Sequence, residues 1–347
     1  MGITLGMGLH WLGKDSYEDL VRLIKEVEDL GYSQIWVSNE KFFHDMYIIA
    51  TIVAEHTTHI KIGTFIADPY THHPALTAMS IGTLDTISGK RAILGIGAGG
   101  TGFPVMGIQR VNPAQAIKES IQVIRGLWKG ETVDLHGKVI KCNKGRLNVL
   151  PPRSDIPVIV ASRGDLVLTL GGEIADGVMI ATYAEPIGIQ HALSLINKGA
   201  RIAGRNLEDI TIISRVDTCI SNDRRAAYEA VKPIVGVFLW TSYPDRKFVN
   251  HVGLSVPPKL EEIIAKRDYN LMAINTHLIP DEFVDKFCWA GTPEEVALKV
   301  ADVAKTGIHN ISILPHPPAG GDIRHTVREF ALTVKPIVDN LLKNKEE

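Results

Sequence analysis

The stretch from residue 60 to residue 100 alternates apolar and amphipathic segments in the manner of a β-α-β unit. It opens with IKIGTF, an apolar run without clean polar alternation, as expected of a strand that is covered on both faces. A helix is expected next, with Pro74 in its first turn and Gly89 as its stop signal. AILGIG then returns as a second buried strand, so the two strands are predicted to be parallel.

The same alternation continues along the chain and predicts an α/β fold. The expected strands cover residues 4–9, 33–38, 60–66, 92–97, 155–162, 177–181, 209–221 and 310–316, and the expected helices cover about residues 16–31, 47–55, 74–88, 113–127, 165–175, 186–204, 292–305 and 323–342. Such a series of strand–helix repeats is typical of a (β/α)8 TIM barrel. A doubly wound open sheet is the alternative, but an eighth strand followed by a closing helix favours the barrel.

Three segments interrupt the alternation. Residues 101–112 form a long loop, residues 130–153 resemble a small β excursion that ends at two prolines, and residues 223–290 are mostly helical. We interpret residues 1–347 as a single barrel domain with these three insertions. Because residues 101–112 and 223–290 are too long for simple connections, we expect them to form walls or a lid over the barrel mouth.

Composition narrows the class of protein. Lys and Arg number 37 against 39 Asp and Glu, so the formal net charge is −2, and no long basic block suggests nucleic acid or an anionic membrane. The three cysteines are odd in number and widely spaced, which argues against a disulfide framework and fits a reducing cytoplasm. We expect no signal peptide and no membrane span.

Two motifs invite functional interpretations that their context disfavours. The run Gly95–Gly100 matches G-x-G-x-x-G, but no helix is expected before Pro113, so a dinucleotide fingerprint is rejected. Those glycines could instead let a planar ring lie close to the backbone. The His72–His73 pair resembles a metal site, yet neighbours in an extended segment point to opposite sides, and we expect no metal there.

Polar residues at the C-terminal ends of the predicted strands are the first functional candidates in a barrel. They are His10, Asn39, Glu40, Asp68, Ser162, Arg163, Thr182 and His316. The segment Ala161-Ser162-Arg163-Gly164 lies between a strand and a helix N-terminus, where free amides and a guanidinium suit a phosphate group. Asp165 directly behind it weakens that interpretation, and an ordinary turn with an exposed arginine is the alternative.

Three long segments carry a family resemblance. KIGTFIADPYTHHPALTAMSIGTLDTISGKRAILGIGAGG, VIVASRGDLVLTLGGEIADGVMI and GTPEEVALKVADVAKTGIHNISI resemble successive parts of the bacterial luciferase-like superfamily. Within it, the chain is most similar to the coenzyme F420-dependent methylenetetrahydromethanopterin reductases and their relatives. The resemblance spans nearly the whole chain and implies a luciferase-like barrel that binds a flavin or deazaflavin and transfers a hydride.

The resemblance also implies site residues. It implies a cis peptide between Phe65 and Ile66, in a bulged third strand that lies behind the cofactor ring. The residues that it implies to contact the cofactor are Phe65, Ile66, Gly97, Ala98, Gly99, Ser162, Arg163 and Gly164, and their places at strand ends add Asn39, Ala161 and Thr182 to the predicted contacts. The implied cofactor is coenzyme F420, with FMN as the alternative, and the implied assembly is a homo-oligomer, either a dimer or a tetramer.

The chain departs from the family pattern at three places. Gly8 stands where the reductases carry a glutamate, Gly100 stands where many relatives carry an acid, and Asn39-Glu40 replaces Asp-His. Glu40 and His10 are then the remaining candidates for moving a proton near the ring, with Glu40 the stronger of the two. A rim glutamate paired with Lys41 is the alternative interpretation of Glu40.

Three function classes stay open at this point. The favoured one is an F420-dependent oxidoreductase that acts on a small organic substrate, either like the methylenetetrahydromethanopterin reductases or like an alcohol or sugar dehydrogenase. The second is an FMN-dependent luciferase-like monooxygenase, and the third is a flavin-binding relative without turnover. The sequence does not identify the substrate.

Overall fold

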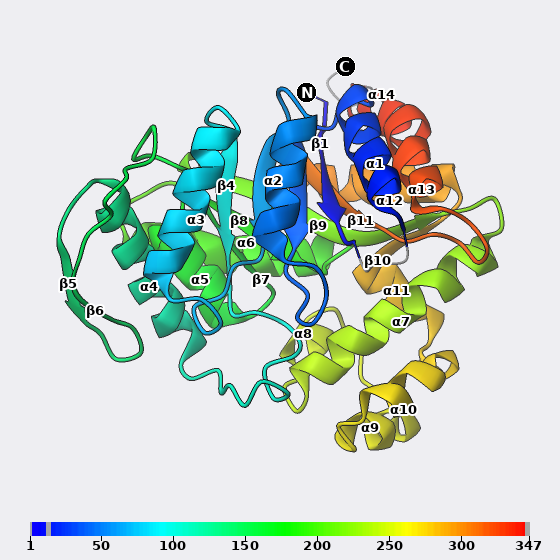
Figure 1. Ribbon diagram of the computed structural model, residues 1–347. Coiled ribbons are helices and arrows are strands. Elements are labelled where there is room, and N and C mark those ends of the chain that lie inside the picture. The colour runs from blue at the N-terminus through cyan, green and yellow to red at the C-terminus, as the bar shows by residue number, and fades with distance from the viewer. Residues whose placement is uncertain (1, 12–14, 344–347) are drawn as a thin grey trace. The chain divides into compact units, whose positions relative to one another are not determined.

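The computed structural model describes residues 2–11 and 15–343 of the chain (Figure 1). Contacts within the chain divide it into two compact units. The first, which we call the N-terminal unit, comprises Gly8–Met179 and Leu195–Thr211, and the second, the C-terminal unit, comprises Met1–Met7, Ile180–Ser194 and Ile212–Glu347. Each unit is described by itself.

The N-terminal unit is built on parallel strands in the order β2-β3-β4-β7. These strands are β2 (Gln34–Ser38), β3 (Lys61–Phe65), β4 (Ala92–Ile96) and β7 (Val158–Ser162), and the helices are α1 (Tyr17–Asp29), α2 (Met46–His56), α3 (Pro74–Ile87), α4 (Pro113–Trp128) and α5 (Asp165–Ile174). The expected boundaries agree with these elements to within a few residues. The sequence also explains where α1 begins, because Ser16 and Asp19 form a capping box at its start.

Two glycines allow the strands of this unit to pack closely. A Cβ atom built on Gly63 of β3 would lie 2.2 Å from the ring of Trp36 on β2. One built on Gly95 of β4 would lie 1.9 Å from the carbonyl oxygen of Thr64. No side chain fits at either position, because contacts this short would force the strands apart.

The predicted β excursion is a hairpin of β5 (Val133–His136) and β6 (Lys141–Gly145). A single carboxylate anchors its turn to α4. Glu119 accepts hydrogen bonds from the backbone N–H groups of Lys138, Val139 and Ile140, at 2.7–2.9 Å, and from the side chain of Gln115. Burial raises the pKa of Glu119, but these hydrogen bonds outweigh it and lower the pKa from 4.5 to about 2.

We predict that this carboxylate makes the fold sensitive to acid. Because its pKa is lower in the folded chain than in the unfolded chain, its contribution is complete above pH 4.5 and is lost as the pH falls toward 2. Wild-type protein should lose about 2–3 kcal/mol more stability over that range than Glu119→Gln. Urea unfolding at several pH values measures this, and parallel curves for the two proteins would contradict it.

The C-terminal unit has its own parallel strands, in the order β10-β9-β11-β1. They are β9 (Thr211–Ile220), β10 (Cys288–Gly291), β11 (Asn310–Pro315) and the first residues of β1 (Thr4–Leu9). Its helices are α7 (Arg224–Ser242), α8 (Lys247–Asn250), α9 (Pro258–Ala265), α10 (Tyr269–Ile274), α11 (Asp281–Phe287), α12 (Pro293–Ala304), α13 (Ile323–Glu329) and α14 (Lys335–Lys343). Helices α7, α9 and α10 pack together as a small group (Figure 1).

Two expectations for this unit need correction. Residues 223–290 do not stay helical to their end, because Cys288–Gly291 forms β10 and pairs with residues 217–220 of β9. A strand of four residues, with no β-branched residue, leaves no periodicity to read. The predicted last helix is also not α-helical throughout, since Phe330–Val334 forms a π-helical segment between α13 and α14.

The strand order confirms the predicted fold class. The full order is β10-β9-β11-β1-β2-β3-β4-β7-β8, with β8 at Gly177–Ala181 and an additional pairing of β9 with β8. Setting β10 aside, eight parallel strands follow one another in a closed order, which is the (β/α)8 barrel, and the open-sheet alternative is wrong. That residues 1–347 act as one domain stays a prediction. Within the described ranges, none of the helices has the length and apolar character to cross a bilayer.

Candidate functional site

The end of β2 is tied to the backbone that follows β3. The backbone N–H of Asn39 donates to the carbonyl of Phe65 at 2.9 Å, and its side-chain amide donates to the carbonyl of Ile66 at 2.9 Å. The peptide bond between Phe65 and Ile66 is cis, as expected. Three of the predicted cofactor contacts therefore lie together in the N-terminal unit.

The two predicted proton-transfer residues also lie together. His10 Nε2 lies 3.8 Å from Glu40 Oε1, and both side chains are partly exposed. The hydroxyl of Thr101 donates to Glu40 Oε2 at 2.9 Å. Thr101 opens the long loop after β4 and was not predicted as a partner, because nothing in the sequence indicates which strand end such a loop will contact.

Lys41 does not pair with Glu40, so the pairing assumed in the alternative interpretation of Glu40 is wrong. Its Nζ lies 2.7 Å from Oδ2 of Asp68, which is completely buried. Asp68 also accepts hydrogen bonds from the backbone N–H groups of Tyr70 and Thr71 and from the hydroxyl of Thr71. Burial raises the pKa of Asp68, but the hydrogen bond and charge of Lys41 and the bonds from Thr71 outweigh it, so the pKa is lowered.

The loop at residues 101–112 covers these strand ends within the N-terminal unit. The guanidinium of Arg110 donates to the carbonyl of Gly99 at 2.8 Å and lies over the ring of Phe103. The Lys41 ammonium lies 5.6 Å from the centre of the same ring. These contacts are consistent with the expectation that residues 101–112 form a wall or lid.

The glycines after β4 are required for different reasons. A Cβ built on Gly97 would lie 2.4 Å from Cδ1 of Ile66 and 2.7 Å from the carbonyl oxygen of Ala161, so Gly97 brings three predicted contact residues together. Gly99 has φ +75°, and a Cβ there would lie 2.4 Å from the Phe103 ring. That a cofactor ring lies against Gly97, Ala98 and Gly99 stays a prediction.

The predicted phosphate segment joins β7 to α5. Ser162 Oγ accepts a hydrogen bond from the backbone N–H of Gly164 at 2.9 Å, and Arg163 is partly exposed. Gly164 is the N-cap of α5, and as a glycine it has no side chain with which to cap this helix start. The first-turn amides of a helix favour an anion, although Asp165 occupies the first position of this helix.

Thr182 lies in the C-terminal unit, directly after β8. It is buried with φ +75°, its backbone N–H donates to the carbonyl of Arg215 at 3.2 Å, and its hydroxyl donates to the carbonyl of Ala181. Its predicted contact with a cofactor is untested by these bonds.

A charged network in the same unit involves residues that sequence reasoning missed. Arg215 Nη1 donates to Asp217 Oδ2 at 2.8 Å, and His316 Nε2 lies 2.8 Å from Asp217 Oδ1. His316 was recognised as a polar residue at a strand end, but Arg215 and Asp217 were not. Their signal is two opposite charges at alternate positions of an otherwise uncharged strand.

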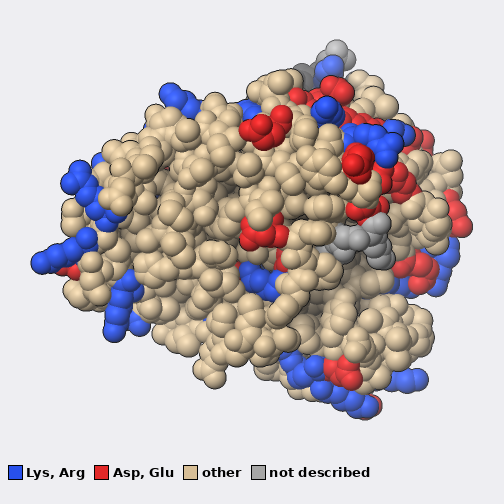
Figure 2. Space-filling view, in the orientation of Figure 1, with Lys and Arg blue, Asp and Glu red and all other residues tan. Residues whose placement is uncertain are grey.

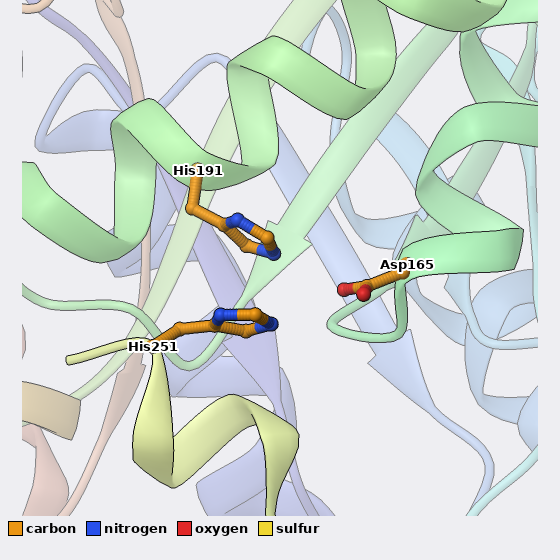
Figure 3. Close-up of side chains that lie close together, drawn as sticks. All are labelled: Asp165, His191 and His251. Atoms are coloured by element: carbon orange, nitrogen blue, oxygen red, sulfur yellow. The ribbon is translucent and has the colours of Figure 1, made fainter. Parts of the chain in front are cut away.

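The other histidines have specific neighbours. His73 caps α3 through Nδ1 and contacts the Lys141 carbonyl through Nε2, while His72 packs edge-on against the Tyr47 ring. In the C-terminal unit, the rings of His191 and His251 stack face to face, with centroids 3.6 Å apart (Figure 3). This stacking was not predicted, because His191 and His251 lie 60 residues apart and share no sequence motif.

Comparisons with known proteins agree on one family. A family model described as luciferase-like monooxygenase matches residues 4–310. The 5,10-methylenetetrahydromethanopterin reductase of Methanolobus tindarius is 32% identical over 308 residues, which cover 88% of this chain and 92% of that protein. The reductase of the same name from Methanopyrus kandleri is 32% identical over 349 residues, covering 96% and 98% of the two chains.

Solved structures are similar over almost the entire chain. The coenzyme F420-dependent tetrahydromethanopterin reductase from Methanopyrus kandleri aligns with a TM-score of 0.83 and 29% identity, covering 97% of this chain and 99% of that one. An F420-dependent secondary alcohol dehydrogenase in complex with an F420-acetone adduct aligns with a TM-score of 0.79 over 97% of this chain. At 18% identity, the latter supports the fold alone.

Proposed function

We propose a function on one premise, which is that the chain belongs to the luciferase-like monooxygenase family. Within it, the protein is an oxidoreductase that uses coenzyme F420 and transfers a hydride between this deazaflavin and a small organic substrate. The observation that carries this proposal is the TM-score of 0.83 to an F420-dependent reductase over 97% of the chain. The 32% identity to two such reductases supports the same chemistry.

The substrate class is the finer part of the proposal. Two candidates are a methylenetetrahydromethanopterin-like pterin and a small alcohol or ketone, since relatives of both kinds share the fold. Gly8 and Gly100 stand where the family resemblance led us to expect acids. We therefore propose that the proton chemistry is carried by Glu40, with His10 3.8 Å away as its neighbour.

The residues of the N-terminal unit fit the cofactor. The first-turn amides of α5, with Ser162, Arg163 and Gly164, would hold its phosphate group. Its ring would lie near Ile66, which packs so closely on Gly97 that a Cβ at Gly97 would lie 2.4 Å from Cδ1 of Ile66. When bound, the reduced deazaflavin supplies a hydride and its oxidised form accepts one. Asn39 would keep the Ile66 backbone in place, and Glu40 would hold or move a proton at the substrate.

Titration of the purified protein with F420 and with FMN, followed by fluorescence, tests the assignment. We expect F420 to bind and FMN to bind much more weakly. Tight binding of FMN with no binding of F420 would replace the proposal by an FMN-dependent monooxygenase. Binding of F420 without turnover on any pterin or alcohol would favour a relative that binds the cofactor without catalysis.

We predict that Arg163→Ala weakens F420 binding. A charge-assisted hydrogen bond to a phosphate contributes about 1.5–3 kcal/mol, so the dissociation constant should rise about 10- to 150-fold. Arg201→Ala, which removes an exposed arginine from α6 (Pro186–Ile202), is the matched control and should leave binding unchanged. Equal affinity of wild type and Arg163→Ala would move the phosphate site away from this loop.

We propose that the protein forms a homo-oligomer through the outer face of α2 and α3. Exposed apolar side chains gather there and on the neighbouring segment before β7, and they include Ile48, Leu76, Met79, Ile87, Val149 and Leu150. A groove of about 510 Å³ runs between α3 and residues 146–151. This side of the unit is largely uncharged (Figure 2). An apolar face of this kind suits burial against a second copy of the chain.

A charge placed on that face should separate the copies. We predict that Met79→Asp shifts the protein to a monomer in analytical ultracentrifugation, because the carboxylate would have to be buried without a partner. Leu298→Asp replaces another exposed apolar side chain, on α12, and should leave the assembly intact. A monomeric wild type, or an unchanged assembly in Met79→Asp, would contradict the proposed interface.

We also propose that the protein acts in a reducing cytoplasm and does not bind nucleic acid. The cysteines Cys142, Cys219 and Cys288 are all buried and free, and the net charge of −2 offers little attraction to phosphate backbones. Acid-quenched cells, with thiols alkylated after denaturation, should yield all three cysteines in reduced form by mass spectrometry. A substantial oxidised fraction would contradict this location.

A further inference from the structure

Two histidines of the C-terminal unit lie against each other and take no part in the function proposed above. His191 belongs to α6 and His251 directly follows α8, and their ring planes differ by only 28°. Their ring centroids are 3.6 Å apart, and a nitrogen of each ring lies on the same side of the stack (Figure 3). Ring nitrogens of the two residues lie within 4.8 Å of each other. The pair therefore brings two imidazole ligand atoms to one place.

The backbone holds both rings in position. His251 is the C-cap of α8, and its N–H donates to the carbonyl of Lys247 at 2.9 Å. On α6, the carbonyl of His191 accepts from the hydroxyl of Ser194 at 2.7 Å, and the next residue, Ala192, is completely buried. Both histidine side chains are themselves partly buried. Side chains anchored in this way lose little further freedom when they bind a ligand together.

Two other histidines lack one of these properties. His73 uses both ring nitrogens on the backbone, because Nδ1 accepts from the N–H of Ala75 at 3.2 Å and Nε2 lies 2.8 Å from the carbonyl oxygen of Lys141. His44 also stacks, with a centroid distance of 3.9 Å, but its partner is Trp11, whose indole N–H can only donate. Stacking on a second imidazole is what adds a second ligand atom.

The spacing of the stacked rings suits one small transition-metal ion. Zn²⁺ binds imidazole nitrogens at about 2.0–2.1 Å, so two nitrogens on a tetrahedral ion are about 3.3 Å apart. The 3.6 Å between the two ring centroids is close to that value. Rotation about each Cβ–Cγ bond, which has broad torsional preferences, would let both lone pairs point at the ion. Imidazole ligands favour Zn²⁺, Cu²⁺ and Ni²⁺ over Mg²⁺ and Ca²⁺, which prefer oxygen.

We propose that His191 and His251 form a binding site for a divalent transition-metal ion, with Zn²⁺ as the expected occupant. Water would complete the coordination of the ion. The bound ion would join α6 to the end of α8, between residues that lie 60 positions apart in the chain. Because closing so long a loop is costly in the unfolded chain and the site exists only in the folded one, the ion should stabilise the fold.

The first test measures Zn²⁺ binding by calorimetry on protein freed of metal with a chelator, and urea unfolding with and without Zn²⁺. We expect one ion per chain. At free Zn²⁺ about 100 times the dissociation constant, the ratio of folded to unfolded protein should rise about 100-fold. His191→Phe and His251→Phe keep an aromatic ring in the stack but remove a ligand, so each should lose the binding and the stabilisation. His277→Phe, which replaces an exposed histidine of the same unit, is the matched control.

The second test identifies the ligands directly. In protein labelled with ¹⁵N-histidine, the loss of a signal in each phenylalanine variant assigns the ring nitrogens of His191 and His251. Zn²⁺ should shift one ring nitrogen of each residue, because the nitrogen that binds the ion changes its electronic environment most. Shifts confined to other histidines would overturn the proposed site.

The outcomes of the binding test are equally decisive. A wild type that binds no Zn²⁺, or phenylalanine variants that bind it as tightly as wild type does, would overturn the proposal. The deciding quantity is the difference between unfolding with and without Zn²⁺, so a change in the stability of the metal-free variants does not affect it. If a phenylalanine variant does not fold, the glutamine variant at the same position replaces it. These measurements need neither F420 nor a substrate, so they are independent of the proposed function.

Discussion

Replacing Glu40 with glutamine is expected to lower turnover about 10²–10⁴-fold while leaving F420 affinity unchanged. Glutamine keeps the shape of the side chain and an oxygen that can accept the hydrogen bond from Thr101, so the loop after β4 should stay in place. What is lost is the ability to hold and release a proton. Steady-state kinetics and an F420 titration on the same preparation separate these two quantities.

Two further variants complete the comparison. Glu55→Gln alters an exposed glutamate of α2 and should match wild type. His10→Ala removes the imidazole that lies 3.8 Å from Glu40. Normal turnover in Glu40→Gln together with a large loss in His10→Ala would transfer the proton role to His10.

Replacing Asp68 with asparagine is expected to destabilise the fold by about 3–5 kcal/mol. Asparagine can still accept from the backbone of Tyr70 and Thr71, but it leaves the Lys41 ammonium, only 10% exposed, without an opposite charge. Breaking a buried ion pair at one partner costs more than the pair itself contributes, because the remaining charge stays desolvated. The midpoint of urea unfolding, converted with the measured m-value, gives the free energy of unfolding.

A double variant tests that reason. Lys41→Met combined with Asp68→Asn removes the uncompensated charge and should recover a large part of the loss. Asp155→Asn changes an exposed aspartate and should stay within about 0.5 kcal/mol of wild type. A double variant as unstable as Asp68→Asn alone would show that packing, and not charge, sets the cost.

The barrel could be predicted from the sequence because buried parallel strands leave continuous apolar runs that are easy to distinguish from amphipathic helices. Strand β10 could not be predicted in this way. It has only four residues, which pair with the C-terminal end of β9 and are too few to show a hydrophobic pattern. The π-helical segment before α14 was missed for a related reason, because a single widened turn preserves the helical pattern on both sides.

Site residues could be predicted from the sequence only where a polar or titratable residue directly follows a predicted strand. Glu40, His10 and Asn39 directly follow strands, so barrel logic found them. The partner of Lys41 was missed because chain neighbours suggest Glu40, while the register of β2 on β3 brings Asp68 within 2.7 Å from 27 residues away. Asp217 was missed because its partner, His316, lies 99 residues further along the chain.

The close packing of β2, β3 and β4 has a consequence for laboratory evolution of this protein. Thr64 Oγ1 bonds to both the N–H and the carbonyl of Gly95, and a Cβ on Gly95 would lie 1.9 Å from the Thr64 carbonyl oxygen. Random substitution at Gly63 or Gly95 would therefore fill a library with clones that cannot fold. Diversity directed to residues 101–112 would vary the surface that covers the strand ends and spare the scaffold beneath it. Libraries for new substrates should be built on that loop.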